Sequence, residues 1–316
     1  MKITILGGGS WGTALAVHLA RKGHILKVWE FNKEQAEEMQ TKRFCKLLPE
    51  AILSENIFTS SNLEDVFIGS ELVFLVVPSD HVEETMEKAK HFIKNQPVII
   101  CSKGFGKDNR LLSDIVREKV SGPIYCLYGP THAEEVCQGM FSGIVLAGAN
   151  GKEQLKKEFE SLEFKVELSD DLVGVQVSAA LKNIIAIFLG ILDGLKLGDN
   201  AKAYFIVKGL EEIRQVGLAL GGREETFHGL AGLGDIIVTG LSKHSRNRHV
   251  GEEVGKGIPL NEVLGEMKMV AEGVITIRNA IKFKEKLKLE LPLTTKLYQI
   301  LFDNLNPKEI INHRLT

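Results

Sequence analysis

The feature that most constrains the fold is a glycine-rich turn close to the amino terminus. Residues Lys2 to Leu6 form a short, isoleucine-rich apolar run, which is typical of a buried strand. Gly7, Gly9 and Gly12 follow it in the spacing G-x-G-x-x-G, and Thr13 to Arg21 then carries apolar residues at helical spacing. In such a unit the first glycine makes the tight turn, the second admits a pyrophosphate to the backbone, and the third lets helix and strand pack closely. The helix amino terminus adds N–H groups and positive potential, so the stretch predicts dinucleotide binding rather than an ordinary glycine turn.

Length and charge narrow the possibilities for the rest of the chain. A length of 316 residues suggests two domains, and a net charge of −2 gives no electrostatic reason to expect nucleic acid or an anionic membrane as a partner. No apolar run reaches transmembrane length, and a strand beginning at residue 3 leaves no room for a signal peptide. We therefore expect no membrane insertion.

The cysteines indicate the compartment. Cys45, Cys101, Cys126 and Cys137 lie far apart and form no C-x-x-C pair. Reduced thiols in a cytoplasmic protein are therefore expected, and a metal site is not.

Strand and helix patterns alternate along the first half of the chain. The expected strands are Ile25–Trp29, Glu71–Val77, Pro97–Cys101, Pro123–Leu127, Ser142–Leu146 and Phe164–Leu168, with helices over Lys33–Gln40 and Lys152–Leu162. Arg43–Ser54 is expected to be irregular. The alternation predicts an α/β fold in which residues 1–168 form a Rossmann-type doubly wound sheet.

The pattern changes near Ser169. Asp171 to Leu195 is a long, mostly apolar stretch at helical spacing, and Ala201 to Leu220 is the next expected helix. Gly190, Gly194 and Gly198 recur every four residues; they would permit close approach of a neighbouring helix, and the last would serve as a carboxyl-terminal stop. Residues 169–316 are therefore expected to form an all-helical second domain.

Candidate cofactor residues follow the second strand. Glu30 stands about where a Rossmann unit places the acid that bonds the adenosine ribose, and its carboxylate would repel a 2′-phosphate, which favours NAD. An exposed strand-end acid is the alternative. Phe31 could lie against the adenine or cap the core, and Lys33 and Lys42 leave NADP open.

Other candidates lie at the carboxyl ends of later strands, where open α/β sheets bind their ligands. Pro78 is predicted to line the nicotinamide side, with a plain turn proline as the alternative. Lys103 stands between a buried strand and two glycines, although most lysines are solvated surface charges. The hydroxyl of Thr131 can turn into the crevice.

The strongest catalytic candidate is Lys182, inside the apolar helix of the second domain. A lysine there must either snorkel to solvent or face a ligand cavity, and desolvation disfavours its charged form, which suits acid–base work. Asn183 could orient a substrate or the lysine, and Asp235 could hydrogen-bond the lysine and hold it in place. The alternative is a lysine at the edge of the helix.

A second candidate site is the stretch Leu241 to Arg248. Ser242 or Ser245 can cap a helix, Arg246 can grip a phosphate with two hydrogen bonds, and Asn247 adds an amide donor. Together with the helix dipole these groups predict a dianion site, with a basic surface loop as the alternative.

Seven motifs occur in an order that resembles one enzyme family. They are Gly7-Gly-Gly-Ser-Trp-Gly12, Ser102-Lys-Gly104, Gly129-Pro-Thr-His-Ala133, Ala180-Leu-Lys-Asn183, Gly229-Leu-Ala-Gly-Leu-Gly-Asp235, Ser245-Arg-Asn247 and Val270-Ala-Glu-Gly273. As a set they resemble the NAD(P)-dependent glycerol-3-phosphate dehydrogenase family from residue 1 to about residue 280. The resemblance implies NAD(P)-dependent reduction of dihydroxyacetone phosphate to sn-glycerol 3-phosphate for phospholipid synthesis, by a protein that is often a homodimer.

The resemblance also assigns roles by motif. It implies that Lys182 is the proton acceptor. The implied substrate positions are Lys103, Gly129, Thr131, Asp235, Ser245, Arg246 and Asn247. The implied cofactor positions are Ser10, Trp11, Lys103, Ala133, Arg246, Val270 and Glu272.

Two positions depart from the family pattern. Thr131 stands where serine is frequent, which keeps the hydroxyl, and Phe31 stands where bacterial members commonly have an arginine that favours NADP. The rival hypotheses are a related 3-hydroxy-acid dehydrogenase and a dinucleotide sensor without turnover. The Ser-Arg-Asn stretch argues against the first, since a substrate without phosphate would not need it, and Lys182 beside Asn183 argues against the second.

Overall fold

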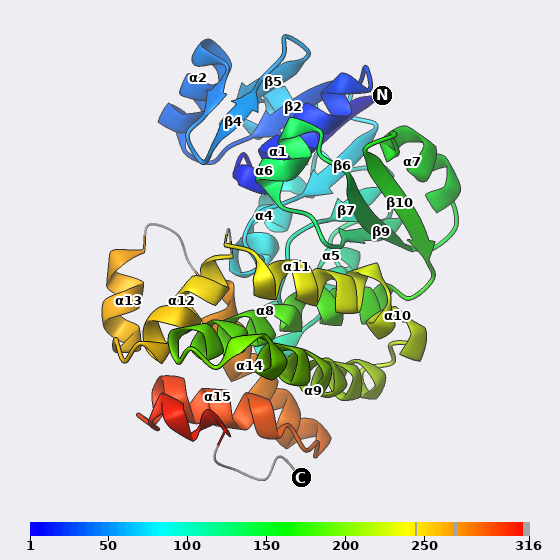
Figure 1. The fold of residues 1–316 in the computed structure, drawn as a ribbon. Helices are drawn as coiled ribbons and strands as arrows, with labels where there is room; N and C mark the ends of the chain where they lie inside the picture. The colour runs from blue at the N-terminus through cyan, green and yellow to red at the C-terminus, as the bar shows by residue number, and fades with distance from the viewer. Residues whose placement is uncertain (244, 268–270, 312–316) are drawn as a thin grey trace. The chain divides into compact units, whose positions relative to one another are not determined.

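The structure is a computed structural model that describes residues 1–243, 245–267 and 271–311. It divides into two compact units, Met1–Leu172 and Val173–Thr316. Figure 1 shows strands and helices in the first unit and helices in the second. Val270, one of the cofactor residues implied by the resemblance, lies outside the described residues.

The first unit is built on an eight-stranded sheet of order β10-β9-β8-β7-β6-β1-β2-β5. Its pairs are parallel except for β8 with β9. The strands of this sheet are β1 (Lys2–Leu6), β2 (Ile25–Trp29), β5 (Ile57–Ser60), β6 (Leu72–Leu75), β7 (Val98–Ile100), β8 (Ile124–Tyr128), β9 (Ser142–Gly148) and β10 (Phe164–Ser169). Four of them, β1, β6, β7 and β8, are buried along nearly their whole length, as parallel strands covered on both faces are.

Short helices connect the strands of the first unit. They are α1 (Ser10–Arg21), α2 (Lys33–Lys42), α3 (Leu63–Phe67), α4 (Val82–Ala89), α5 (Leu112–Arg117), α6 (Ala133–Gln138) and α7 (Lys152–Phe159), with 3-10 turns at Ser79–His81 and Lys107–Asn109. The order of the strands reverses between β1 and β6, so that the loops after these two strands meet at the switch point of a doubly wound sheet. The predicted fold class is confirmed for this unit.

Two segments of the first unit differ from expectation. Arg43–Ser54 is not irregular, because Phe44–Cys45 (β3) pairs antiparallel with Leu48–Ile52 (β4). This short hairpin has no clear alternation of apolar residues, and Pro49 within β4 argued against a strand. The strand expected over Glu71–Val77 ends at Leu75, since the chain turns there toward the switch point.

The described part of the second unit is helical. Its helices are α8 (Leu172–Gly194), α9 (Gly198–Ala219), α10 (Glu224–His228), α11 (Asp235–Leu241), α12 (Arg246–Gly255), α13 (Leu260–Glu266), α14 (Glu272–Leu287) and α15 (Pro292–Phe302), with a π-helical turn at Leu230–Gly234 and a 3-10 turn at Pro307–Ile311. The expectation that no apolar run reaches transmembrane length is wrong for α8, which is long and apolar enough to cross a membrane. Its apolar window is entirely buried within the protein, as in the core helix of a globular unit. Gly198 is not the stop of α8: the helix ends at Gly194, and Gly198, with φ +78°, begins α9.

Candidate active site

The glycine turn after β1 has the geometry that a dinucleotide phosphate requires. A Cβ on Gly12 would lie 1.9 Å from the carbonyl oxygen of Gly7, and one on Gly7 would lie 2.9 Å from the backbone of Val76. A Cβ on Gly9 would meet nothing within 4 Å, so space remains in front of the turn. Gly9 is also the N-cap of α1, so no side chain caps the first N–H groups of that helix, and they stay available to an anion.

Two side chains of the turn support this reading. The indole Nε1 of Trp11 is buried and, among the described residues, has no hydrogen-bond partner, so a bound cofactor could satisfy it. The hydroxyl of Ser10 donates to the carbonyl oxygen of Leu47 at 2.6 Å and ties the turn to the β3–β4 hairpin. The residues present therefore fit a dinucleotide.

Glu30 is buried, with 4% of its surface exposed, so the alternative of an exposed strand-end acid is wrong. Its Oε1 accepts the backbone N–H of Asn32 at 3.0 Å, and it also accepts a bond from the backbone of Gly8. Burial raises the pKa of this carboxyl above its ordinary value, while the two backbone bonds oppose that shift. Glu30 therefore braces the glycine turn, and a carboxylate that accepts two bonds keeps capacity for a ribose hydroxyl.

Phe31 is 78% exposed, so it does not cap the core, and contact with an adenine remains the prediction for it. The nearby cations are engaged on the surface of α2, where Lys33 lies 3.8 Å from Glu37 and Lys42 donates to Glu38 at 2.6 Å. Pro78 is exposed at the start of a 3-10 turn.

Hydrogen bonds join the end of β6 and the residues after it, the loop after β7 and the last residue of β8. The hydroxyl of Ser102 donates to the carbonyl oxygen of Leu75 at 3.3 Å and to that of Val77, and Tyr128 donates to the carbonyl oxygen of Ser102. Lys103 follows Ser102 directly and is half-buried. These hydrogen bonds therefore hold the backbone of Lys103 at the carboxyl edge of the sheet.

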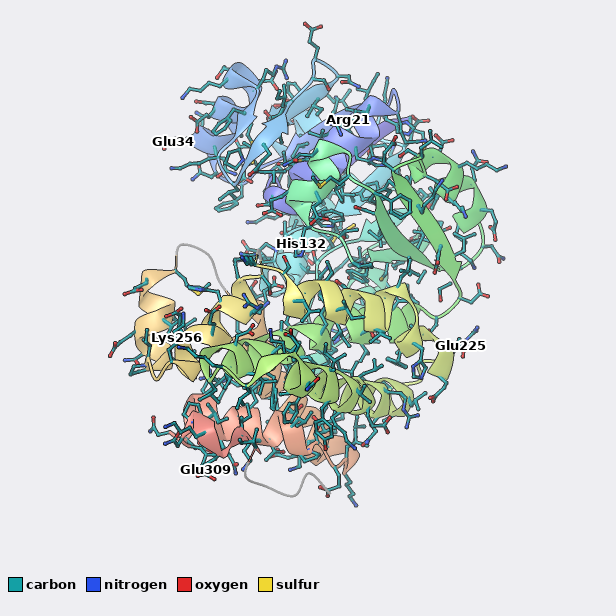
Figure 2. The ribbon with its side chains drawn as sticks, viewed as in Figure 1. Arg21, Glu34, His132, Glu225, Lys256 and Glu309 are labelled. Atoms are coloured by element: carbon teal, nitrogen blue, oxygen red, sulfur yellow. The ribbon has the colours of Figure 1, made fainter. Side chains whose placement is uncertain are left out.

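The loop after β8 has a defined shape. The hydroxyl of Thr131 donates to the carbonyl oxygen of Gly129 at 3.2 Å, so it is turned back on its own loop while its lone pairs can still accept a bond. His132 precedes α6, and Figure 2 labels it there. Ala133 is the first residue of α6 and is buried.

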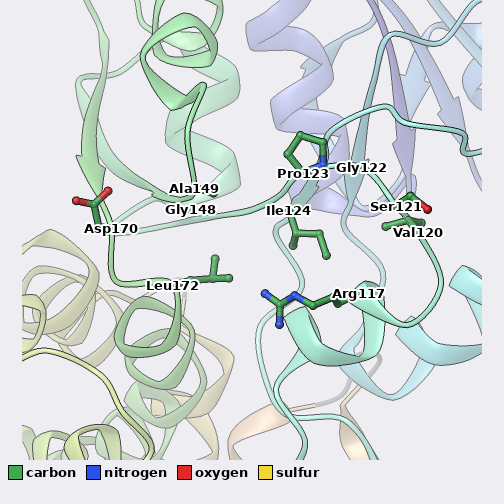
Figure 3. Close-up of a pocket in the computed structure, with 10 residues that line it drawn as sticks. All are labelled: Arg117, Val120, Ser121, Gly122, Pro123, Ile124, Gly148, Ala149, Asp170 and Leu172. Carbon is green, nitrogen blue, oxygen red and sulfur yellow. The ribbon is translucent and has the colours of Figure 1, made fainter.

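A cavity within the first unit lies elsewhere. It has a volume of about 560 Å³ and opens at the amino edge of the sheet, where Pro123 precedes β8 and Gly148 ends the antiparallel β9 (Figure 3). The charged residues that line it have partners, since Arg117 bonds Asp114 at 2.9 Å and Asp170 bonds Lys152. No candidate residue lines this cavity, so we place the candidate site at the carboxyl edge.

The second unit contains a buried ion pair on two helices. Lys182 of α8 is buried, and its Nζ donates to Oδ1 of Asp235, which is fully buried at the start of α11. Lys182 is thus neither snorkelling nor at the edge of the helix. The π-helical turn before Asp235 requires glycine, because a Cβ on Gly232 would lie 2.0 Å from the carbonyl oxygen of Phe227. The glycine-rich stretch 229–234 therefore positions Asp235.

One contact of this pair was missed from the sequence. The hydroxyl of Thr239 donates to Oδ1 of Asp235 at 3.3 Å. Its spacing of four residues from Asp235 on α11 would have been the signal, since residues i and i+4 share a helix face. The carboxylate is thereby oriented from its own helix.

The Ser-Arg-Asn stretch forms the start of α12. Ser245 is the N-cap, and its hydroxyl accepts the backbone N–H of Arg248 at 3.2 Å. Arg246 is exposed at the first helical position, whereas Asn247 is buried. Oδ1 of Asn247 accepts the backbone N–H of Gly273 at 3.0 Å, which directs its NH₂ group elsewhere as a donor.

Two more candidates lie beside Asn247. A Cβ on Gly273 would lie 2.7 Å from Oδ1 of Asn247 and 3.0 Å from the carbonyl oxygen of Asn183. Asn183 is buried next to Lys182, and Glu272 begins α14 directly before Gly273. The second unit therefore brings Lys182, Asn183, Asp235 and the start of α12 into one cluster of contacting elements.

Comparison with known proteins agrees with this arrangement. Residues 2–154 match the family described as NAD-dependent glycerol-3-phosphate dehydrogenase N-terminus, and residues 171–312 match its C-terminus. A glycerol-3-phosphate dehydrogenase [NAD(P)+] of Thermoanaerobacter sp. (strain X514) is 41% identical over 320 residues, covering 100% of this chain and 97% of the relative. Its counterpart in Fusobacterium nucleatum is 39% identical and covers 99% of this chain and 96% of that protein.

A solved structure shares the whole architecture. The crystal structure of glycerol-3-phosphate dehydrogenase from Coxiella burnetii superposes with a TM-score of 0.93 at 34% identity, covering 98% of this chain and 97% of that chain. The agreement extends over both units in sequence and in structure. The chain therefore belongs to the NAD-dependent glycerol-3-phosphate dehydrogenase family, a family of NAD(P)-dependent oxidoreductases.

Proposed function

We propose that this chain catalyses reversible reduction of dihydroxyacetone phosphate to sn-glycerol 3-phosphate with a preference for NAD(H). The observation that carries the proposal is the buried Lys182–Asp235 pair in the same unit as the Ser245-capped start of α12. The first offers a proton at a carbonyl, and the second offers charge and N–H groups to a phosphate. A 3-hydroxy-acid dehydrogenase would have no use for the second.

The cofactor would be held by the glycine turn, with Gly7, Gly9, Ser10, Trp11 and Gly12 around the phosphates. We assign Glu30 and Phe31 to the adenosine end, and Pro78, Lys103, Ala133, Arg246, Val270 and Glu272 to the remaining contacts. The bound dinucleotide supplies the hydride that reaches C2 of the substrate. The buried carboxylate of Glu30 disfavours a 2′-phosphate and supports the preference for NAD(H).

Lys182 is the proposed acid–base group. As an ammonium it donates a proton to the oxygen at C2 during reduction, and as an amine it accepts that proton during oxidation. Asp235 orients Nζ, since its carboxylate is fixed by burial and by Thr239. Lys103 helps to polarise the carbonyl, and Asn183, Gly129 and Thr131 complete the contacts with the carbon chain.

The phosphate group is assigned to α12. Arg246 provides a guanidinium at the first turn, Asn247 provides its NH₂ group, and Ser245 begins a helix of ten residues whose dipole favours an anion. Holding the phosphate at α12 fixes C2 of the substrate relative to Lys182, because α12 and Lys182 lie in the same unit.

An assay of NADH consumption with dihydroxyacetone phosphate tests the proposal. Turnover is expected, with kcat/KM higher for NADH than for NADPH, and Arg246→Ala should raise KM for the substrate by about 30-fold to 1,000-fold, equivalent to roughly 2–4 kcal/mol. No turnover would contradict the activity, and an unchanged KM in Arg246→Ala would place the phosphate elsewhere. The matched control is Lys256→Met at the other end of α12, which Figure 2 labels on the surface and which should leave KM unchanged.

Three further properties belong to the same proposal. Four free, buried cysteines support a reducing, cytoplasmic location. The role in phospholipid synthesis and the homodimeric state are inferred from the family. Sedimentation of the purified protein measures its oligomeric state directly.

A further inference from the structure

Helices α8 and α12 contact each other backbone to backbone. A Cβ on Gly190 of α8 would lie 2.0 Å from the carbonyl oxygen of Arg248, and one on Gly251 of α12 would lie 1.9 Å from the carbonyl oxygen of Ile187. Gly194 and Gly255 meet in the same way, with a Cβ on Gly194 only 2.8 Å from Cα of Gly255. The glycines at four-residue spacing thus bring the start of α12 next to the helix that carries Lys182.

This contact restricts sliding of the two helices, because a shift along the axis would bring a side chain against backbone that a glycine now meets. The glycines themselves form no directional bond, since they have no side-chain donor or acceptor. A directional polar contact at the same place would hold the first turn of α12, and Arg246 on it, more firmly relative to Lys182.

A polar cluster at this contact supplies directional bonds. Nε of Arg248 on α12 donates to Oδ2 of Asp193 on α8 at 2.8 Å, and a terminal nitrogen of the same guanidinium lies 2.6 Å from that oxygen as an ion pair. Oδ1 of the same carboxylate pairs with Lys202 of α9, and Arg248 also lies 3.4 Å from Glu252. The Arg248 and Asp193 side chains are only 17% and 16% exposed, so solvent screens the pair weakly.

We propose that Asp193 and Arg248 are positioning residues for substrate phosphate, because they hold the first turn of α12 in its register on α8. The Nε–H bond and the close terminal nitrogen of one planar guanidinium meet the same carboxylate oxygen, so they define an orientation as well as a distance. Fixing register is also the best-attested use of a poorly exposed polar pair. The inference rests on the proposed phosphate site at Ser245–Asn247.

The same geometry divides the work of the two arginines in the Ser-Arg-Asn-Arg stretch. Arg248 faces the carboxylates of Asp193 and Glu252, which balance its charge, so it adds little attraction for an anion. Arg246, two residues earlier, is exposed on the first turn. Asn247 between them accepts a hydrogen bond from Gly273, so a shift of α12 would displace Arg246 and Asn247 together and weaken the proposed contacts with the phosphate.

Steady-state kinetics of Asp193→Asn, Arg248→Met and Arg248→Lys test the proposal. Each should raise KM for dihydroxyacetone phosphate by about 10-fold to 100-fold, the cost of a displacement of the order of 1 Å. The Kd for NADH should change much less than this KM, since the glycine turn is unaltered and Arg246 is the one assigned cofactor contact on α12. Arg248→Lys keeps the charge but loses the planar guanidinium and its Nε–H bond, so it should resemble Arg248→Met. Asp193→Asn with Arg248→Met should have no more effect than either change alone.

The control is Arg214→Met, which breaks an ion pair of Arg214 with Glu211 at 2.8 Å and Glu224 at 2.7 Å in the same unit. It should lower the melting temperature without raising KM. If Arg246→Ala raises KM but all three register variants leave it unchanged, the positioning role is overturned while the proposed phosphate site stands. If Arg246→Ala itself leaves KM unchanged, both fail together. A rise in KM that scales with lost melting temperature, Arg214→Met included, would also overturn the inference.

Discussion

Replacing Lys182 with methionine tests the chemistry most directly. Methionine keeps much of the apolar stem and removes the group that exchanges a proton. The change lies on α8 and leaves the glycine turn untouched, so affinity for cofactor should be nearly intact. Loss of general acid–base catalysis should lower kcat by about 10²–10⁴-fold, and loss of a cation beside the developing alkoxide should add to that.

The same change should also destabilise the second unit. The side chain of Asp235 is 0% exposed and that of Lys182 only 6%, so the methionine variant leaves a buried carboxylate without its cation. Breaking a buried pair from one side costs about 3–5 kcal/mol. Removing both charges, in Lys182→Met with Asp235→Asn, should restore most of that stability because no buried charge remains.

The assay therefore has two readouts. Chemical denaturation should give a lower free energy of unfolding for Lys182→Met than for the double variant, while kcat stays low in both. The pH profile of the parent should show a limb that is missing in Lys182→Met. Turnover of Lys182→Met at close to the parent rate would refute the acid–base role, and Lys103 would be the next residue to test. Equal stability of the single and double variants would refute the energetic account of the pair.

Three more changes test other parts of the structure. Gly190→Ala should destabilise the second unit by about 1–3 kcal/mol or more, because its Cβ would lie 2.0 Å from the backbone of Arg248, whereas Gly265→Ala, which meets nothing within 4 Å, should stabilise it by about 0.4–1 kcal/mol; thermal unfolding compares them. Glu30→Gln should lower the preference for NADH over NADPH by about tenfold, or about 1.4 kcal/mol, and an unchanged ratio of kcat/KM would show that Glu30 only braces the turn. Glu212 caps α15 by accepting bonds from Leu293 and Thr294, and burial raises its pKa above the ordinary 4.5. The folded protein therefore holds the proton of this carboxyl more tightly than the unfolded chain does. The contribution of protonated Glu212 to stability is fully present below pH 4.5 and falls as the pH rises through the folded pKa. Glu212→Gln should flatten the dependence of the melting temperature on pH in that window, and a dependence equal to that of the parent would contradict this account.

The sequence by itself determined the class of the fold and the residue types of the site. The strand before Gly7 and the glycine spacing after it have few structural solutions, because a chain that turns so tightly into a helix needs glycine at those points. A lysine inside the apolar run of α8 was visible for a similar local reason, since burying an amine there is costly without a partner or a task. Family resemblance then assigned roles that periodicity alone does not give.

Tertiary structure decided which of these residues meet. Asp235 is 53 positions from Lys182, and only the packing of α8 with α11 joins their side chains. Glu30 and Phe31 are adjacent in the sequence, yet one is 4% exposed and the other 78%, because the end of β2 turns one side chain under the glycine turn and the other into solvent. The Asp193–Arg248 pair had no signal in the sequence, since a charge on a helix near glycines is usually solvated. Long-range pairing depends on how helices cross, and local pattern does not encode the crossing.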